Sequence, residues 1–231
     1  MSKIVVIHQP DFLSYLGFFH RLLHSDLYVV LDDVQFVKSN NSWTHRDKIK
    51  TQNGDKWLTI SVKKASRDTN INKILLNDTI EWKKQNLDLV KQNYKKSKYF
   101  NEIFPYLEKL YSKEYEKLAD FNMASILMLM ELFDIKIDIV YSSDLQTSKT
   151  KSERLVEILT QVDATHYLSG IGAKDYHIDK PFDDAKIEVI WQYFKHPVYP
   201  QVYKEFIQYL SSIDLLFNCG IEESRKIIRS I

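Results

Sequence analysis

The sequence predicts an α/β protein with a mainly parallel, Rossmann-like sheet, helices on both faces and a helical insertion or cap over about 79–133. Short apolar runs rich in β-branched residues recur along the chain, as in strands that are buried on both faces. Helical patterns separate most of these runs, and such crossovers imply parallel pairing. The alternation stops between about 79 and 133, where three helical segments follow one another, and then resumes.

The first strand–helix–strand unit occupies residues 4–31. Residues 4–7 and 27–31 are apolar runs, and Ser14 is expected to cap a helix between them. Residues 37–55 are polar and carry turn signals, so a loop is expected there. The alternation over 57–62 predicts a further strand.

The second half of the sequence begins with helical patterns and then returns to alternating strands and helices. Helices are expected over roughly 79–97, 99–112 and 114–133, and the last of these is apolar nearly all round. A strand over 135–141 follows, and the capping box Thr150-x-x-Glu153 opens a helix through Leu159. Strands over 165–168 and 187–193 precede a closing amphipathic helix over 220–231. Because no linker or repeat divides the chain, residues 1–231 are expected to form a single domain.

Composition excludes several classes of protein. Hydrophobic residues make up 44% and charged residues 27% of 231, as in ordinary globular proteins. A formal net charge of +1 gives no overall attraction to nucleic acid, and the lysines of 83–98 are interpreted as a solvated helix face. No signal peptide or apolar stretch of roughly 20 residues is found. The lone Cys219 suits a reducing compartment, so we expect a cytoplasmic protein without membrane insertion.

Polar clusters directly follow three of the expected strands. They are His8-Gln9-Pro10, Asp32-Asp33-Val34-Gln35 and Ser169-Gly170-Ile171-Gly172. In open α/β sheets, ligands bind at the carboxyl ends of the strands, so these clusters mark the candidate site.

Each cluster has a functional and a structural interpretation. His8 suits proton transfer or phosphate contact, but a histidine bonded to backbone at a strand end is an equal alternative. Asp32 and Asp33 are consecutive, so their side chains diverge in extended backbone and a carboxylate dyad is not expected. One could bind Mg²⁺ or a ribose, and the alternative is a pair of turn-forming aspartates.

A basic segment and a glycine-containing turn complete the candidate set. Trp43, Arg46 and Lys48 lie in a segment that could clamp phosphate, or simply form a solvated loop. The backbone amides of Ser169, Gly170 and Gly172 could approach an anion, although an ordinary turn has the same sequence. The sequence has none of the common nucleotide-binding or hydrolase motifs and no metal-ligand spacing, so no metal site is expected.

Taken together, these clusters resemble the WbqC-like family nearly end to end. The matching segments are Ile7-His8-Gln9-Pro10, Leu16-Gly17-Phe18-Phe19, Leu31-Asp32-Asp33-Val34-Gln35-Phe36, Ser42-Trp43 with Arg46, Trp57-Leu58-Thr59, Tyr167-Leu168-Ser169-Gly170 with Tyr176, Tyr199-Pro200-Gln201 and residues 212–220. His20 and His45 depart from the residues expected at their positions. A fainter similarity, carried by Gly17 and Gln35-Phe36, is to pantothenate-synthetase-type nucleotidylyltransferase folds.

The resemblance implies an enzyme of surface-polysaccharide biosynthesis of the O-antigen type, which acts on a nucleotide-activated amino sugar and forms an amide on its amine. His8, Asp32 and Asp33 would be catalytic. Gln9, Gln35, Trp43, Arg46, Lys48, Ser169, Gly170 and Gly172 would bind phosphate or nucleotide, and Tyr176, Tyr199, Gln201 and Asn218 would contact substrate. ATP with Mg²⁺, or an acyl-CoA donor, would supply the activated acyl group. A non-catalytic nucleotide-binding subunit and a glycosyltransferase are the alternatives, and the oligomeric state is left open.

Overall fold

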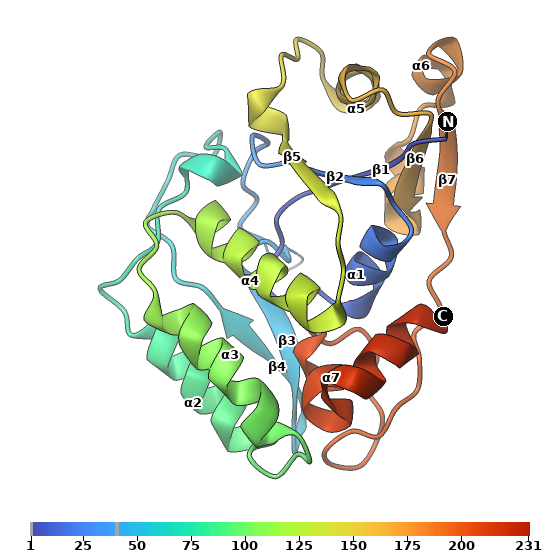
Figure 1. Ribbon diagram of the computed structural model, residues 1–231. Helices are drawn as coiled ribbons and strands as arrows, with labels where there is room; N and C mark the ends of the chain where they lie inside the picture. Colours follow the sequence, from blue (N-terminus) through green and yellow to red (C-terminus); the bar gives the residue numbers. More distant parts are fainter. Residues whose placement is uncertain (1, 40–41) are drawn as a thin grey trace.

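A five-stranded parallel sheet forms the centre of the computed structural model, which describes residues 2–39 and 42–231. The strands are β1 (Ile4–His8), β2 (Leu27–Val30), β5 (Asp138–Tyr141), β6 (His166–Gly170) and β7 (Glu188–Gln192). Their order is β5-β2-β1-β6-β7, and every pairing is parallel (Figure 1). The predicted sheet is therefore confirmed.

The central strand β1 marks the point at which the strand order changes direction. From β1 the chain continues outward through β2 and β5 on one side, and then returns to add β6 and β7 on the other. Ile4 pairs with His166, so β1 and β6 run side by side in register. Their carboxyl ends, at His8 and Gly170, consequently flank a topological switch point, where ligands of open α/β sheets bind.

Helices cover both faces of the sheet, as predicted. One core cluster unites Val6 of β1 with α1 (Leu16–Leu23) and α4 (Leu118–Phe133). The other unites Val5 and Ile7 with α5 (Lys151–Gln161) and α6 (Asp179–Asp184). Alternate β1 side chains thus enter opposite cores, as the two-residue period of a strand requires.

An antiparallel hairpin replaces the loop expected over 37–55. It consists of β3 (Arg46–Thr51) and β4 (Gly54–Thr59), so the strand predicted over 57–62 begins and ends earlier. Gly54 turns the chain at φ +112°, a conformation that favours glycine. Ile49 and Leu58 are buried, which shows that this polar segment contributes apolar side chains to the core.

Three further helices surround the hairpin. Helix α2 (Trp82–Tyr94) packs on the hairpin, and α3 (Phe100–Ser112) packs between α2 and α7 (Ile213–Arg229) (Figure 1). Helix α7 begins earlier than predicted and is kinked at Gly220, whose φ of +76° is left-handed. The sequence did not predict α6 or the 3₁₀ segment Ile171–Tyr176.

The predicted helix caps are not made by side chains. The Ser14 hydroxyl donates to the carbonyl of Asp11, and α1 starts after Tyr15. Thr150 precedes α5 without a side-chain cap hydrogen bond. Among the helices of the described residues, none is long and apolar enough to cross a membrane.

Candidate active site

A cavity of about 440 Å³ lies at the carboxyl ends of β1 and β6, at the switch point. We call it the switch-point pocket. Its polar lining comes from β1 and the turn after it, from α1, from the hairpin, and from the segment that follows β6. These side chains and glycines include His8, Asp11, Ser14, Arg21, Trp43, Asp47, Ser169, Gly170 and Gly172.

His8 is held as a neutral imidazole. Its Nδ1 lies 2.9 Å from the carbonyl of Gln9, and because a carbonyl can only accept, this contact places the proton on Nδ1. Its ring packs edge-on against Phe18 at 5.1 Å. Burial, with the charge of Arg21, lowers the pKa of His8 to about 3. Nε2 has no protein hydrogen-bond partner in residues 2–39 and 42–231, so its lone pair remains available in the pocket.

Asp11 lies beside His8, with Oδ2 3.8 Å from Nδ1. Thr44 donates its hydroxyl to Oδ1 at 3.1 Å. Burial raises the pKa of Asp11 to about 7, although the Thr44 hydrogen bond and Arg21 both oppose the rise. A carboxyl with a pKa near neutrality is suited to general acid–base work. His8 and Asp11 together form what we call the His8–Asp11 pair.

Arg21 supplies a buried positive charge. Only 4% of the residue is exposed, and Nη1 donates to Oε1 of Gln192 at 2.7 Å. Gln192 is fixed in turn, since its Nε2 donates to the carbonyl of Gly17 and to Nδ1 of His20, both at 2.9 Å. No carboxylate of the described chain lies within ion-pair distance of Arg21. A buried guanidinium without an acidic partner is a ready site for an anionic group of a ligand.

The absence of a side chain at Gly170 makes room for Arg21. A Cβ built on Gly170 would lie 2.9 Å from Nη1 of Arg21, which is too close. A Cβ on Gly172 would meet nothing within 4 Å. Glycine at the end of β6 therefore allows the guanidinium to reach the pocket, a role different from the predicted amide cradle.

Asp47 adds a second carboxyl from β3. It is 2% exposed, and its Oδ1 accepts the amide of Lys48 at 2.6 Å. Burial raises the pKa of Asp47 well above its usual range, and the nearby Asp11 adds to the rise. The switch-point pocket thus contains one guanidinium, one neutral imidazole and two carboxyls whose pKa values are raised.

Five of the predicted site residues line this pocket: His8, Trp43, Ser169, Gly170 and Gly172. The Ser169 hydroxyl donates to Tyr167 at 3.4 Å, and the Trp43 ring packs on Trp57 at 5.2 Å. Gln9 lines an adjacent, smaller cavity of about 240 Å³, which shares the lining residues Asp11 and Trp43 with the pocket. The predicted shared pocket therefore contains only part of the predicted set.

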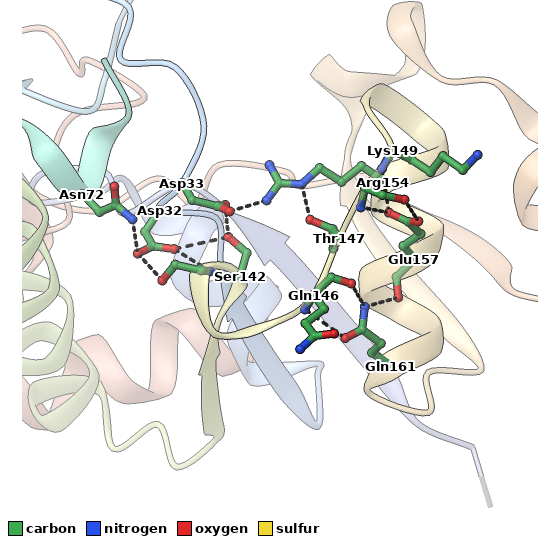
Figure 2. Close-up of polar contacts among 12 residues, drawn as sticks. Asp32, Asp33, Asn72, Ser142, Gln146, Thr147, Lys149, Arg154, Glu157 and Gln161 are labelled. Atoms are coloured by element: carbon green, nitrogen blue, oxygen red, sulfur yellow. Dashed lines mark hydrogen bonds and ion pairs between the residues drawn. The ribbon is translucent and has the colours of Figure 1, made fainter. Parts of the chain in front are cut away.

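Asp32 and Asp33 lie outside the switch-point pocket and bridge neighbouring elements (Figure 2). Asp32 is 5% exposed and accepts hydrogen bonds from Asn72 at 3.1 Å, from the Ser143 amide at 3.1 Å and from the Ser143 hydroxyl at 2.8 Å. Asp33 forms an ion pair with Arg154 of α5. Partial burial opposes the shift, but hydrogen bonds from Arg154 and Ser142 lower the pKa of Asp33. Both carboxylates fasten the end of β2 to the segment after β5.

The cations of the hairpin also lie outside the pocket lining. The guanidinium of Arg46 lies 4.1 Å from the centre of the Trp57 ring, and Lys48 forms an ion pair with Asp55 at 2.8 Å. Gln35 donates to the carbonyl of Arg67 at 2.8 Å, in another part of the surface. The phosphate-binding roles predicted for these three residues remain predictions, and they would require a ligand that extends beyond the pocket.

Three of the predicted substrate contacts belong to an internal polar network. Tyr199 and Gln201 donate to the buried carboxylate of Asp214, at 2.9 and 2.7 Å. Asn218 accepts the amide of Val202 at 2.8 Å and donates to the Asp214 carbonyl at 2.7 Å. These bonds hold the segment before α7 against that helix. The fourth predicted contact, Tyr176, is 84% exposed and lies outside the pocket lining.

Asp11, Arg21 and Asp47 are the charged pocket residues that sequence reasoning missed. Asp11 directly follows the identified His8-Gln9-Pro10 cluster, so extending that cluster by one residue would have included it. Arg21 stands between the apolar residues of α1, and Asp47 alternates with Ile49 along β3. For Arg21 the available signal was a charged residue within the apolar pattern of a predicted helix, whereas Asp47 lay in a segment predicted to be a loop and had no such signal.

The fold and the pocket define an α/β protein with a candidate ligand site at the switch point of a parallel sheet. Residues 9–226 match the WbqC-like protein family, and the chain belongs to that family. It is 30% identical, over 96% of each chain, to the uncharacterized protein Rv1507c of Mycobacterium tuberculosis. No solved structure matches the chain significantly.

Proposed function

We propose that this protein is an enzyme of surface-polysaccharide biosynthesis that forms an amide on the amine of a nucleotide-activated amino sugar. The observation that carries the proposal is the His8–Asp11 pair in a pocket that also holds the buried, unpaired charge of Arg21. The pair supplies acid–base chemistry, and the guanidinium supplies an anchor for an anionic group. The polysaccharide context rests on the family resemblance.

Amide formation requires a neutral amine and an activated acyl group. The amine nitrogen attacks the acyl carbon, a carbon–nitrogen bond forms, and the bond to the leaving group breaks with its electron pair. The sugar ammonium loses two protons in total. The His8–Asp11 pair takes the first and passes it to solvent. The second goes to the leaving thiolate of coenzyme A, or to solvent when the leaving group is a phosphate.

The remaining charged groups fit binding rather than proton transfer. Arg21 would hold a carboxylate or phosphate of the acyl donor, because its planar fork matches two anionic oxygens. Asp47, whose burial favours the neutral form, would donate a hydrogen bond as a carboxylic acid. This assignment moves the catalytic carboxyl from Asp32 and Asp33 to Asp11.

Product analysis tests the proposal directly. The protein is incubated with UDP- or dTDP-linked amino sugars and either an acyl-CoA or a carboxylic acid with ATP and Mg²⁺, and the amide is detected by mass spectrometry. Asp11→Asn and His8→Gln should abolish the product while both variants stay folded. Binding of the sugar nucleotide without amide formation, under either donor condition, would favour the non-catalytic subunit and overturn the proposal.

A further inference from the structure

A second concave surface carries an unusual concentration of positive charge. This basic groove, of about 530 Å³, is lined by Lys38, Lys63, Lys64 and Arg67, together with Gln35, Phe36, Val37 and Val62. The four cations are exposed, and none of them forms an ion pair within the described part of the chain. The groove lies where residues 35–38, after β2, face residues 62–67, after β4.

The charge of the groove is a local property of the fold. The whole chain has a net charge of only +1, and some lysines elsewhere form ion pairs, such as Lys48 with Asp55 and Lys180 with Asp184. Among the described residues, no acidic side chain lines the groove. Four like charges repel one another in one concavity, so a multiply charged anion would relieve the repulsion and bind there.

The groove is connected to the switch-point pocket through shared lining residues. The pocket and the smaller cavity beside it share Asp11 and Trp43, and that smaller cavity and the basic groove share Val37. The smaller cavity therefore adjoins both the pocket and the groove. Val37 is 54% exposed and offers apolar surface next to the lysines.

We propose that the basic groove binds the phosphate groups of the nucleotide that serves the reaction. This inference rests on the proposed function and adds to it the surface that holds those phosphates. Lys63, Lys64 and Lys38 contact the phosphate oxygens as point charges, and Arg67 contributes a guanidinium fork. Arg21 in the switch-point pocket then remains free for the acyl donor.

Titration with inorganic pyrophosphate and with UDP, followed by calorimetry at low salt, tests the site without catalysis. Lys38→Ala/Lys63→Ala/Lys64→Ala should weaken the binding of both probes at least tenfold. The matched control, Lys91→Ala/Lys95→Ala/Lys96→Ala, removes three exposed lysines from the region of α2 and should leave binding within twofold of the wild type. Unfolding curves of both variants establish that each is folded.

Three results would overturn the inference: no binding of either probe to the wild type, equal loss in the groove and control variants, or loss on Arg21→Leu with the groove variant unaffected. UDP that binds more tightly than pyrophosphate supports a nucleotide, and equal affinities would mean a general polyphosphate site instead of the proposed one. A failure of the proposed amide-forming chemistry can be distinguished from a failure of phosphate binding in the groove. His8→Gln should retain UDP binding in the groove, so a missing amide product with intact, groove-dependent UDP binding refutes the chemistry alone.

Discussion

Nη1 of Arg21, on α1, donates to Oε1 of Gln192, at the end of β7, at 2.7 Å. The partner is a neutral amide, which fixes the direction of the guanidinium without cancelling its charge. Gln192 is itself held by Gly17 and His20, so the arrangement is rigid before any ligand arrives. A charged group that is oriented in advance loses little entropy when it binds an anion.

Replacement of Arg21 should abolish binding of the acyl donor while it changes the stability of the fold only slightly. We expect Arg21→Leu to change the free energy of unfolding by less than about 2 kcal/mol, because removal of a lone buried charge offsets the lost hydrogen bond. The increase in melting temperature produced by the acyl donor should disappear. Arg225→Leu, at a helix surface where Arg225 pairs with Glu222, should retain that increase. A donor-induced shift that survives in Arg21→Leu would contradict the anchoring role.

The two glycines after β6 offer a matched comparison. Gly170→Ala places a methyl group 2.9 Å from Nη1 of Arg21, so the guanidinium must move from Gln192. We expect a loss of about 1–3 kcal/mol in the free energy of unfolding from this overpacking. Gly172→Ala meets no atom within 4 Å and should change stability by less than about 0.5 kcal/mol. Chemical denaturation measures both, and equal effects would contradict the close approach of Arg21.

Catalysis should depend on pH through Asp11. The carboxyl must be ionised to accept a proton, and its pKa is raised to about 7 by burial. We therefore expect kcat/KM for the sugar nucleotide to rise with pH and to level off above about 7. Asp47→Asn should keep the midpoint, because burial, Thr44 and Arg21 set the pKa of Asp11. A profile that is flat from pH 5.5 to 8.5 would exclude Asp11 as the proton acceptor.

The same carboxyl should affect the pH dependence of folding. Its pKa is higher in the folded state than the unfolded value of about 3.9, so its contribution to stability is complete below about pH 4 and is lost as the pH rises to about 7. The raised pKa of Asp47 likewise makes its contribution to stability fall as the pH rises. The pKa of His8 is lowered, so its contribution to stability is lost as the pH falls from about 6.5 toward 3. The difference in unfolding free energy between the wild type and Asp11→Asn isolates the first contribution. It should shrink from pH 4 to 7, and a constant difference would contradict the raised pKa.

Asp32 should prove structural. Asp32→Asn places an amide against donors from Asn72 and Ser143, and we expect it to lower the free energy of unfolding by about 1.5–3 kcal/mol. Asp138→Asn, on the exposed side of β5, should cost less than about 0.5 kcal/mol. Thermal unfolding with and without millimolar Mg²⁺ tests the alternative role. A stabilisation by Mg²⁺ that Asp32→Asn removes would identify Asp32 as a metal ligand instead.

The parallel sheet was predictable because its inner strands, such as β1 and β2, are buried on both faces. Val5, Val6, Val29 and Val30 are fully buried, so the sequence shows a continuous apolar run at β1 and at β2. The hairpin strand β3 lacked this signal, since its residues are mostly charged and their burial depends on distant partners. Lys50, for example, is buried only because Gln201 and Glu205 accept its ammonium protons.

The position of the site was predictable, but its chemistry was only partly so. The carboxyl-end rule located His8 and Ser169 correctly in one pocket, because it depends only on strand order. The rule does not say which way a side chain turns after the strand ends. Asp33 forms an ion pair with Arg154, which lies more than a hundred residues further along the chain. A local sequence pattern cannot predict such a long-range pair.

The strand order also determines how late in synthesis the sheet can be completed. The central strand β1 is made first, yet its neighbour β6 follows roughly 160 residues later, since Ile4 pairs with His166. At 5–20 residues per second, ribosomes need about 10–30 seconds to cover that interval. One edge of β1 remains without its partner throughout this time, and an unpaired edge can join another chain. The strand that carries His8 therefore spends this interval with one unpaired edge.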